Sequence, residues 1–141
     1  MLLRICFYSS LILLSSLDIL ERKIPNSYLY FLFIFIFTNL ISSDYFSLPG
    51  RLIISLAIAS ILFVIRYLTK GLGMGDVKLV FVTAFATSFF ETIVSLLIAC
   101  LIASICFIIL KVRNHEIKKI PFVPFISTGY FVTGFLLRGT V

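Results

Sequence analysis

Long apolar runs separated by short polar breaks fill the chain from one end to the other. They occupy residues 2–17, 28–41, 52–68, 77–90, 92–110 and 121–137. A helix needs about 20 residues to cross a hydrocarbon layer of about 30 Å, a length these runs reach if their helices extend into the flanking polar residues. The pattern predicts an all-α polytopic membrane bundle of about six transmembrane helices, formed by one integral-membrane domain over residues 1–141.

The first apolar run has a second interpretation. Within it, Arg4 precedes an apolar stretch that ends near Ser15 and Ser16, as in a secretory signal peptide. However, no A-x-A-like cleavage site is present, and further apolar runs follow along the whole chain. We therefore expect the first run to be a retained helix.

The composition agrees with a membrane protein. Hydrophobic residues make up 61% of the 141 residues and charged residues only 13%, and the mean hydropathy is +1.19. Soluble domains are nearer half apolar and a quarter charged, so a soluble enzyme, a disordered tail and a nucleic-acid-binding module are excluded. Cys6, Cys100 and Cys106 all lie in apolar runs without a CxxC pair, which predicts neither a disulfide framework nor a thiolate metal site.

The net charge of +6 has a topological explanation. Nine of the 12 Lys and Arg residues lie in or beside the breaks after the first, third and fifth runs, namely Arg22, Lys23, Arg66, Lys70, Lys78, Lys111, Arg113, Lys118 and Lys119. Arg4, Arg51 and Arg138 lie on the other side. The positive-inside rule then places the nine-charge face in the cytoplasm and both termini outside.

Small residues recur at four-residue spacing in two of the apolar runs. They are Ser95, Ala99 and Ala103 in the fifth run, and Ser55 with Ala59 in the third. Such spacing lets helix backbones approach closely inside a bilayer. We therefore expect these residues to pack against neighbouring helices.

Two of the six acidic residues stand at positions that matter for chemistry. Asp18 closes the first run and Asp76 opens the fourth, so both lie at the cytoplasmic membrane boundary in this topology. An ionisable group there is costly and suggests function. Asp76 is also well placed as the N-cap of the fourth helix, so capping and catalysis both remain open. Asp18 meets the helix dipole unfavourably, although Arg22 is within reach as an ion-pair partner.

The residues around Asp76 favour a site that holds an extended peptide. Gly73 and Gly75 belong to a glycine-rich stretch that leaves the backbone accessible beside the carboxylate. The spacing differs from that of phosphate-binding glycine loops. Lys78 has two interpretations: it meets an acidic group of the substrate, or it extends to the lipid headgroups.

The remaining polar and proline positions have structural interpretations. Pro25 ends the first helix, and Asn26 or Ser27 caps the second. Pro121 and Pro124 begin the sixth helix. His115, next to Glu116 in a basic loop, is interpreted as a solvated residue, and no cluster of metal-ligating residues is visible.

The order of these motifs resembles that of the type IV prepilin peptidases, the GxGD class of intramembrane aspartic proteases. The matching elements are Asp18, then IPN at 24–26, GMGDVKL at 73–79 and PFVPF at 121–125. The resemblance implies an aspartic endopeptidase without a metal or other cofactor, in which Asp18 and Asp76 form the catalytic pair and Gly73, Gly75 and Lys78 contact the substrate. Two carboxylates in one site do not both ionise cheaply, so one would keep a proton and the other would act as a base.

The same resemblance implies a substrate and a location. The substrate would be a prepilin or pilin-like (pseudopilin) precursor with a basic cytoplasmic leader and a transmembrane helix. The enzyme would be a multi-pass protein of the bacterial cytoplasmic (inner) membrane, in contact with lipid and not with nucleic acid, with its active site facing the cytoplasm. Larger members have an additional N-terminal domain, often with CxxC pairs, that is associated with N-methylation. This sequence has no such region, so we expect a short, peptidase-only form.

Two other classes of protein accommodate carboxylates in a membrane bundle. One is a small proton- or ion-coupled transporter or channel component, and the other is a non-catalytic subunit of a pilus or secretion assembly. A transporter is disfavoured because the chain shows no pair of similar halves and both acids lie at one boundary. The GMGD motif with both acids intact disfavours a non-catalytic subunit.

Overall fold

The fold is all-α, as the apolar pattern predicts. The computed structural model describes residues 2–21, 25–44, 48–69, 73–112 and 122–138. Within them lie α1 (Leu2–Glu21), α2 (Asn26–Asp44), α3 (Leu48–Thr69), α4 (Met74–Ala86), α5 (Phe89–Val112) and α6 (Val123–Arg138), with no strand in these residues. Each helix overlaps one of the apolar runs.

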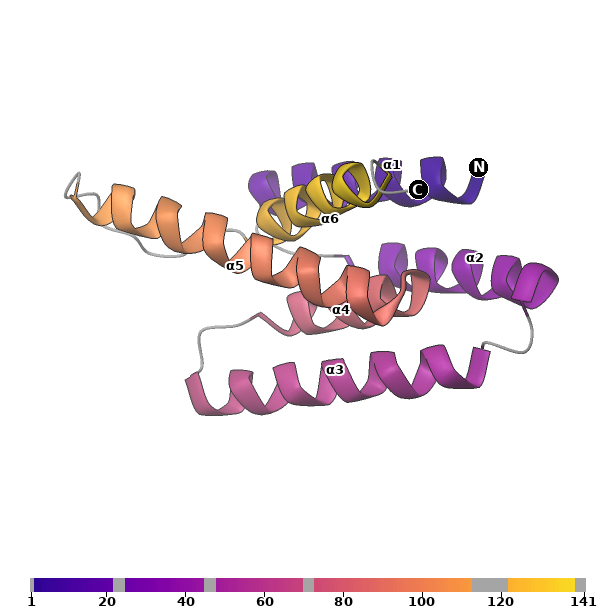
Figure 1. Cartoon of the computed structure of the whole chain (residues 1–141). Coiled ribbons are helices and arrows are strands. Elements are labelled where there is room, and N and C mark those ends of the chain that lie inside the picture. The colour runs from indigo at the N-terminus through magenta and orange to yellow at the C-terminus, as the bar shows by residue number, and fades with distance from the viewer. Residues whose placement is uncertain (1, 22–24, 45–47, 70–72, 113–121, 139–141) are drawn as a thin grey trace.

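The helices pack into a ring with α3 added on one side. In order around the ring, α1 packs on α2, α2 on α4, α4 on α5, α5 on α6 and α6 on α1, while α3 covers α4 and α2. Figure 1 shows α1 and α6 together on one side of the bundle and α3 on the opposite side, with α5 extending beyond its neighbours. Both α1 and α4 therefore pack against α2, which lies between them in the ring.

Successive helices run in opposite directions, so their ends gather at two sides of the molecule. The last turns of α1, α3 and α5 and the first turns of α2, α4 and α6 lie toward the same end in Figure 1. The start of α1 and the end of α6 lie toward the other end. This arrangement brings the end of the first helix and the beginning of the fourth to one side of the bundle, as the sequence predicts for Asp18 and Asp76.

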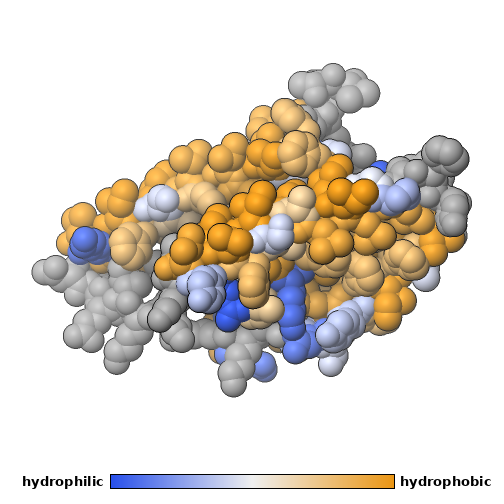
Figure 2. All heavy atoms as spheres, turned by 90° about the horizontal axis from the view of Figure 1, so that it is seen from below, coloured by the Kyte–Doolittle hydropathy of each residue, from blue (hydrophilic) through white to orange (hydrophobic). Residues whose placement is uncertain are grey.

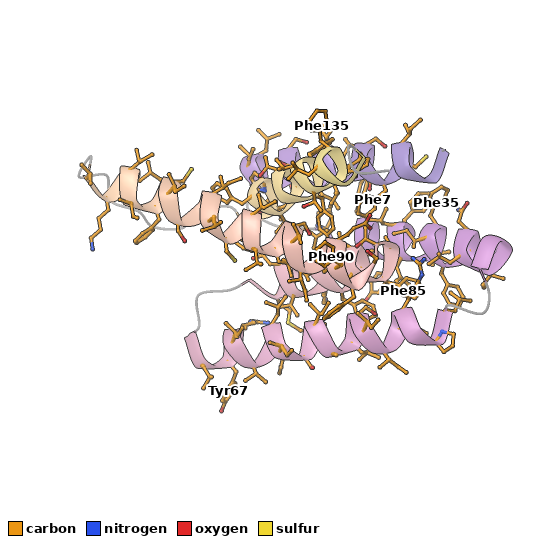
Figure 3. All side chains as sticks on the ribbon, viewed as in Figure 1. Phe7, Phe35, Tyr67, Phe85, Phe90 and Phe135 are labelled. Atoms are coloured by element: carbon orange, nitrogen blue, oxygen red, sulfur yellow. The ribbon has the colours of Figure 1, made fainter. Side chains whose placement is uncertain are left out.

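The outward surface is largely apolar. Among the described residues, two helices are long and apolar enough to cross a membrane, at Leu48–Leu68 and Phe89–Val112. Tyr67 and Phe135 point away from the bundle, with 79% and 83% of their surface exposed, whereas Phe7 and Phe85 point between the helices (Figure 3). Hydrophobic residues also dominate the face in Figure 2. Large exposed apolar surfaces of this kind mark contact with a membrane or a partner.

The boundary between the fourth and fifth helices differs from the predicted one. The apolar pattern placed it at Glu91, but α4 ends at Ala86 and Glu91 belongs to the first turn of α5. The Ser88 N–H donates to Glu91 Oε2 at 3.2 Å, and the Glu91 N–H donates to Ser88 Oγ at 3.3 Å. These two reciprocal hydrogen bonds between Ser88 and Glu91 cap the start of α5. The charged residue Glu91 therefore lies in the first turn of a helix and not in the break between two helices.

The short helix α4 is the core of the bundle. Its buried residues include Leu79 and Phe85, which are completely enclosed. The rings of Phe33 on α2 and Phe85 on α4 lie 5.3 Å apart, and Phe33 also stacks on Phe81 at 5.7 Å. Aromatic contacts at such separations add to the apolar burial. They hold α4 against α2 within about three turns of Asp76.

The predicted small-residue stripe in the fifth helix lies at the closest contact between two helices. Ser95 and Ala99 are buried, and Gly129 of α6 lies directly against the Ser95 carbonyl group. In the third helix, Ser55 is also buried. Small side chains let the backbones of α5 and α6 approach, as expected for helices packed in a membrane.

Candidate active site

Asp18 lies in the last turn of α1 and only 7% of its surface is exposed. Its Oδ2 accepts a hydrogen bond from the backbone N–H of Val123 at 3.2 Å. Val123 is the first residue of α6, so the carboxyl lies at a helix N-terminus, where the dipole favours negative charge. The unfavourable position of Asp18 at the end of its own helix is thus offset by the start of another.

The sequence around Val123 leaves its N–H free for Asp18. The N–H groups of Phe125 and Ile126 both donate to the carbonyl oxygen of Phe122, at 3.1 and 3.2 Å. Pro124 has no N–H, and this position in a first helical turn needs none. The PFVPF segment therefore presents a backbone donor to the carboxyl of Asp18. From the sequence, this segment is predicted to start the sixth helix and resembles a family motif, but its contact with Asp18 is not predicted.

Asp76 lies in the first turn of α4, but it is not the predicted N-cap. The helix begins at Met74 with Gly73 as its N-cap, so Asp76 is the third helical residue. Its Oδ2 accepts a hydrogen bond from the Gly73 N–H at 3.2 Å. A carboxylate in the first turn also meets the positive end of the helix dipole. Capping and catalysis are therefore compatible roles for Asp76, because only one of its carboxylate oxygens accepts the hydrogen bond from the Gly73 N–H.

The structure brings the two carboxyls together. Asp18 follows the apolar run 2–17 and Asp76 precedes the run 77–90, so both lie outside the predicted membrane-spanning segments. Burial and, to a smaller extent, the negative charge of Asp18 together raise the pKa of Asp76 to about 6, against the opposing effect of the Gly73 hydrogen bond. Burial also raises the pKa of Asp18, against the hydrogen bond from Val123. Two acids removed from solvent to different extents, each of which disfavours ionisation of the other, can share one proton.

Lys78 and Asn26 meet beside this pair. The Lys78 ammonium donates to Asn26 Oδ1 at 3.0 Å, joining α4 to the first residue of α2. Asn26 thus lies inside α2, and its side-chain oxygen is used by Lys78, so the predicted capping role for Asn26 is wrong. At the turn itself, the Tyr28 N–H donates to the carbonyl oxygen of Pro25 at 3.1 Å. Pro25 precedes the second helix as predicted.

Comparison with known proteins decides the family. Residues 5–108 match the sequence model of the type IV leader peptidase family. The chain belongs to the type IV leader peptidase family. No curated protein matches the chain, and no solved structure matches it either. The matched region, more than half of the chain, contains both Asp18 and Asp76.

Membership of the leader peptidase family fixes the broad activity and location. The chain is a peptidase, a hydrolase of peptide bonds, and its family is one of membrane peptidases. The match to the family model ends at residue 108, before the PFVPF segment, so the contact between Val123 and Asp18 rests on the structure and not on the match.

Several predicted residues of this leader peptidase fall outside the described part of the chain. Arg22, the suggested partner of Asp18, is one of them, and so are Pro121, His115 and Glu116. In the described residues no three His, Cys, Asp or Glu side chains come together in a group that would hold a metal ion. Cys6, Cys100 and Cys106 are free thiols.

Gly73 has a steric role in this site that can be tested. Its φ of −70° and ψ of 147° are open to any residue, but a Cβ there would lie 2.9 Å from Asp76 Oδ2. We expect Gly73→Ala to push the carboxyl out of position and lower kcat about 10-fold or more, because small displacements of catalytic groups are costly. Cleavage kinetics measure the effect. An unchanged kcat, with the protein still folded by thermal unfolding, contradicts this role for Gly73.

Proposed function

We propose that this leader peptidase is an aspartic endopeptidase that removes the basic leader of type IV prepilins or pilin-like precursors. Asp18 and Asp76 are its catalytic residues. The observation that carries the proposal is the electrostatic interaction of two carboxyls from helices far apart in sequence, one buried and one half-buried, each held by the N-terminus of a helix. The family match supports the peptidase activity.

The proposed reaction uses the unequal protonation of the pair. The ionised carboxylate takes a proton from a water molecule between the two groups, and the water oxygen bonds to the scissile carbonyl carbon. The protonated partner then gives its proton to the leaving amine as the C–N bond breaks. Because the pair titrates as a unit, the proton is assigned to the pair and not to one residue.

The active site is proposed to face the cytoplasm in a bundle with six membrane crossings. Support comes from the alternating helix directions: the helix ends that flank the sequence segments richest in Lys and Arg lie at the end that holds both aspartates. Both termini then lie outside the cytoplasm. In a bacterium, such a multi-pass protein lies in the cytoplasmic membrane, where prepilin leaders are accessible from inside.

Substrate binding is proposed to use the glycine-rich turn and the membrane-facing surface. Gly73 and Gly75 leave the backbone beside Asp76 accessible to an extended peptide, and Lys78 lies half-buried next to it. A basic cytoplasmic face does not attract a basic leader, so selectivity is attributed to the transmembrane helix of the substrate and to residues at the cut. No cofactor takes part in this proposal, and N-methylation of the product is not included.

The proposal is tested with the purified chain in lipid vesicles. A precursor that carries a basic leader and its transmembrane helix is added, and mass spectrometry identifies the new N-terminus. Cleavage at the leader boundary is expected, and a leader peptide without the helix is expected to be cut poorly. If the precursor stays intact while the same vesicles carry a proton flux, the transporter interpretation replaces this one. An intact precursor without a flux favours the non-catalytic assembly subunit.

A further inference from the structure

The hydrogen bond between Lys78 and Asn26 joins α4, which carries Asp76, to α2. Lys78 lies two residues after Asp76 in the first turns of α4, and Asn26 begins the helix that follows Asp18 along the chain. The Nζ–Oδ1 distance is 3.0 Å. The charged donor strengthens this contact relative to a hydrogen bond between neutral groups, and water competes for it because Asn26 is exposed and Lys78 is half-buried.

The packing of the bundle gives this contact its importance. Asp18 is carried by α1 and Asp76 by α4, and both helices pack on α2. The spacing of the two carboxyls therefore depends on how α4 is seated against α2. Farther along α4, Phe81 stacks on Phe33 and Phe85 packs against the same ring at a tilt, and both contacts hold α4 against α2. Near the end that holds the catalytic pair, the hydrogen bond from Lys78 to Asn26 also joins α4 to α2.

We propose that Asn26 is a positioning residue of the peptidase. Its amide oxygen holds the Lys78 ammonium, seats the first turn of α4 against α2, and so sets the spacing between the carboxyls of Asp76 and Asp18. The proposal rests on the proposed function of the two aspartates. It gives Asn26 a role that acts through Lys78 and touches neither the water nor the substrate.

Kinetics of Asn26 variants test the proposal. Asn26→Ala removes the acceptor, and we expect kcat to fall about 10-fold with little change in KM, the loss that a charge-assisted hydrogen bond supports. Asn26→Asp keeps an acceptor oxygen at the same position and is expected to retain most of the activity. The matched control is Asn39→Ala, which removes an amide from the opposite end of α2, where Asn39 donates to the carbonyl oxygen of Phe35 at 2.8 Å.

A double-mutant cycle separates positioning from unrelated effects. Lys78→Met should lower kcat, and adding Asn26→Ala should cause little further loss, because both changes remove the same contact. Independent, multiplying losses in kcat contradict the proposal. So does an Asn26→Ala variant as active as Asn39→Ala, or an Asn26→Asp variant as impaired as Asn26→Ala.

Thermal unfolding of the same four proteins gives a readout that needs no activity. We expect the Tm of the double variant to be no lower than that of the less stable single variant. If the unmodified chain cuts no precursor but this coupling in Tm is present, the proposed function fails while the contact stands. If the chain is active and the Tm losses simply add, the positioning role of Asn26 fails and the catalytic pair is unaffected.

Discussion

Asp18→Asn and Asp76→Asn should each abolish leader cleavage, with kcat lowered by at least about 10³-fold. An amide cannot take the proton from water or return one to the leaving amine. The loss should be similar for both variants and should not multiply in the double variant, because the two groups act as a unit. Cleavage of a membrane-embedded precursor, followed by gel shift and mass spectrometry, measures this effect.

The matched control for these substitutions is Glu91→Gln. It also exchanges an acid for its amide, but in the first turn of α5, beyond the far end of α4 from Asp76. A glutamine at this position can still accept the hydrogen bond from the Ser88 N–H and cap α5. This variant should cleave at the rate of the unmodified chain. Activity retained by either aspartate variant would rule out the pair, whereas a loss shared by Glu91→Gln would point to general damage from changing an acid.

The sequence predicts that Asp18 and Asp76 lie at the same end of the bundle, because this depends only on successive helices running in opposite directions. Helices that alternate in direction bring the end of the first and the beginning of the fourth to the same side, whatever their exact packing. Apolar runs locate helices reliably, since each run must be buried or face lipid. The resemblance around GMGD then selected these two of the six acids.

The partners of individual polar side chains were not predictable in the same way. The sequence pattern predicts that Glu91 separates two apolar runs, that Asp76 is the N-cap of the fourth helix and that Asn26 caps the second. These predictions use only the neighbours of each residue along the chain. In the structure Glu91 caps the next helix, Asp76 binds back to Gly73, and Asn26 binds Lys78 on another helix. A polar residue near a helix end has several acceptors within reach, and tertiary packing selects among them.

The contact of Asp18 with Val123 shows a second limit. The donor is a backbone N–H, so the identity of residue 123 carries no signal for it. The available clue was Pro124, which lacks an N–H of its own and commonly occupies the first turn of a helix. That clue indicates a helix start, but only the packing of α6 on α1 shows that a carboxyl lies at this start.

Gly129→Ala should be the most damaging of the small substitutions for stability. A Cβ at residue 129 would collide with the carbonyl oxygen of Ser95 and press on the Cβ of Ala99 at 3.3 Å. The carbonyl belongs to the backbone of α5 and cannot turn aside, so α5 and α6 must separate. We expect a loss of about 2 to 3 kcal/mol in the free energy of unfolding, the range for overpacked cores. Thermal unfolding in detergent or lipid measures it.

Gly50→Ala provides the matched control, because it adds the same methyl group to a helix at a site where no atom lies within 4 Å of the new Cβ. Gly50 is in the first turn of α3, where alanine restricts the unfolded chain and should stabilise by about 0.4 to 1 kcal/mol. The two variants should therefore shift Tm in opposite directions. Equal shifts would mean that α5 and α6 are not in backbone contact at Gly129, and that the small residues at Ser95 and Ala99 have another purpose than close helix packing.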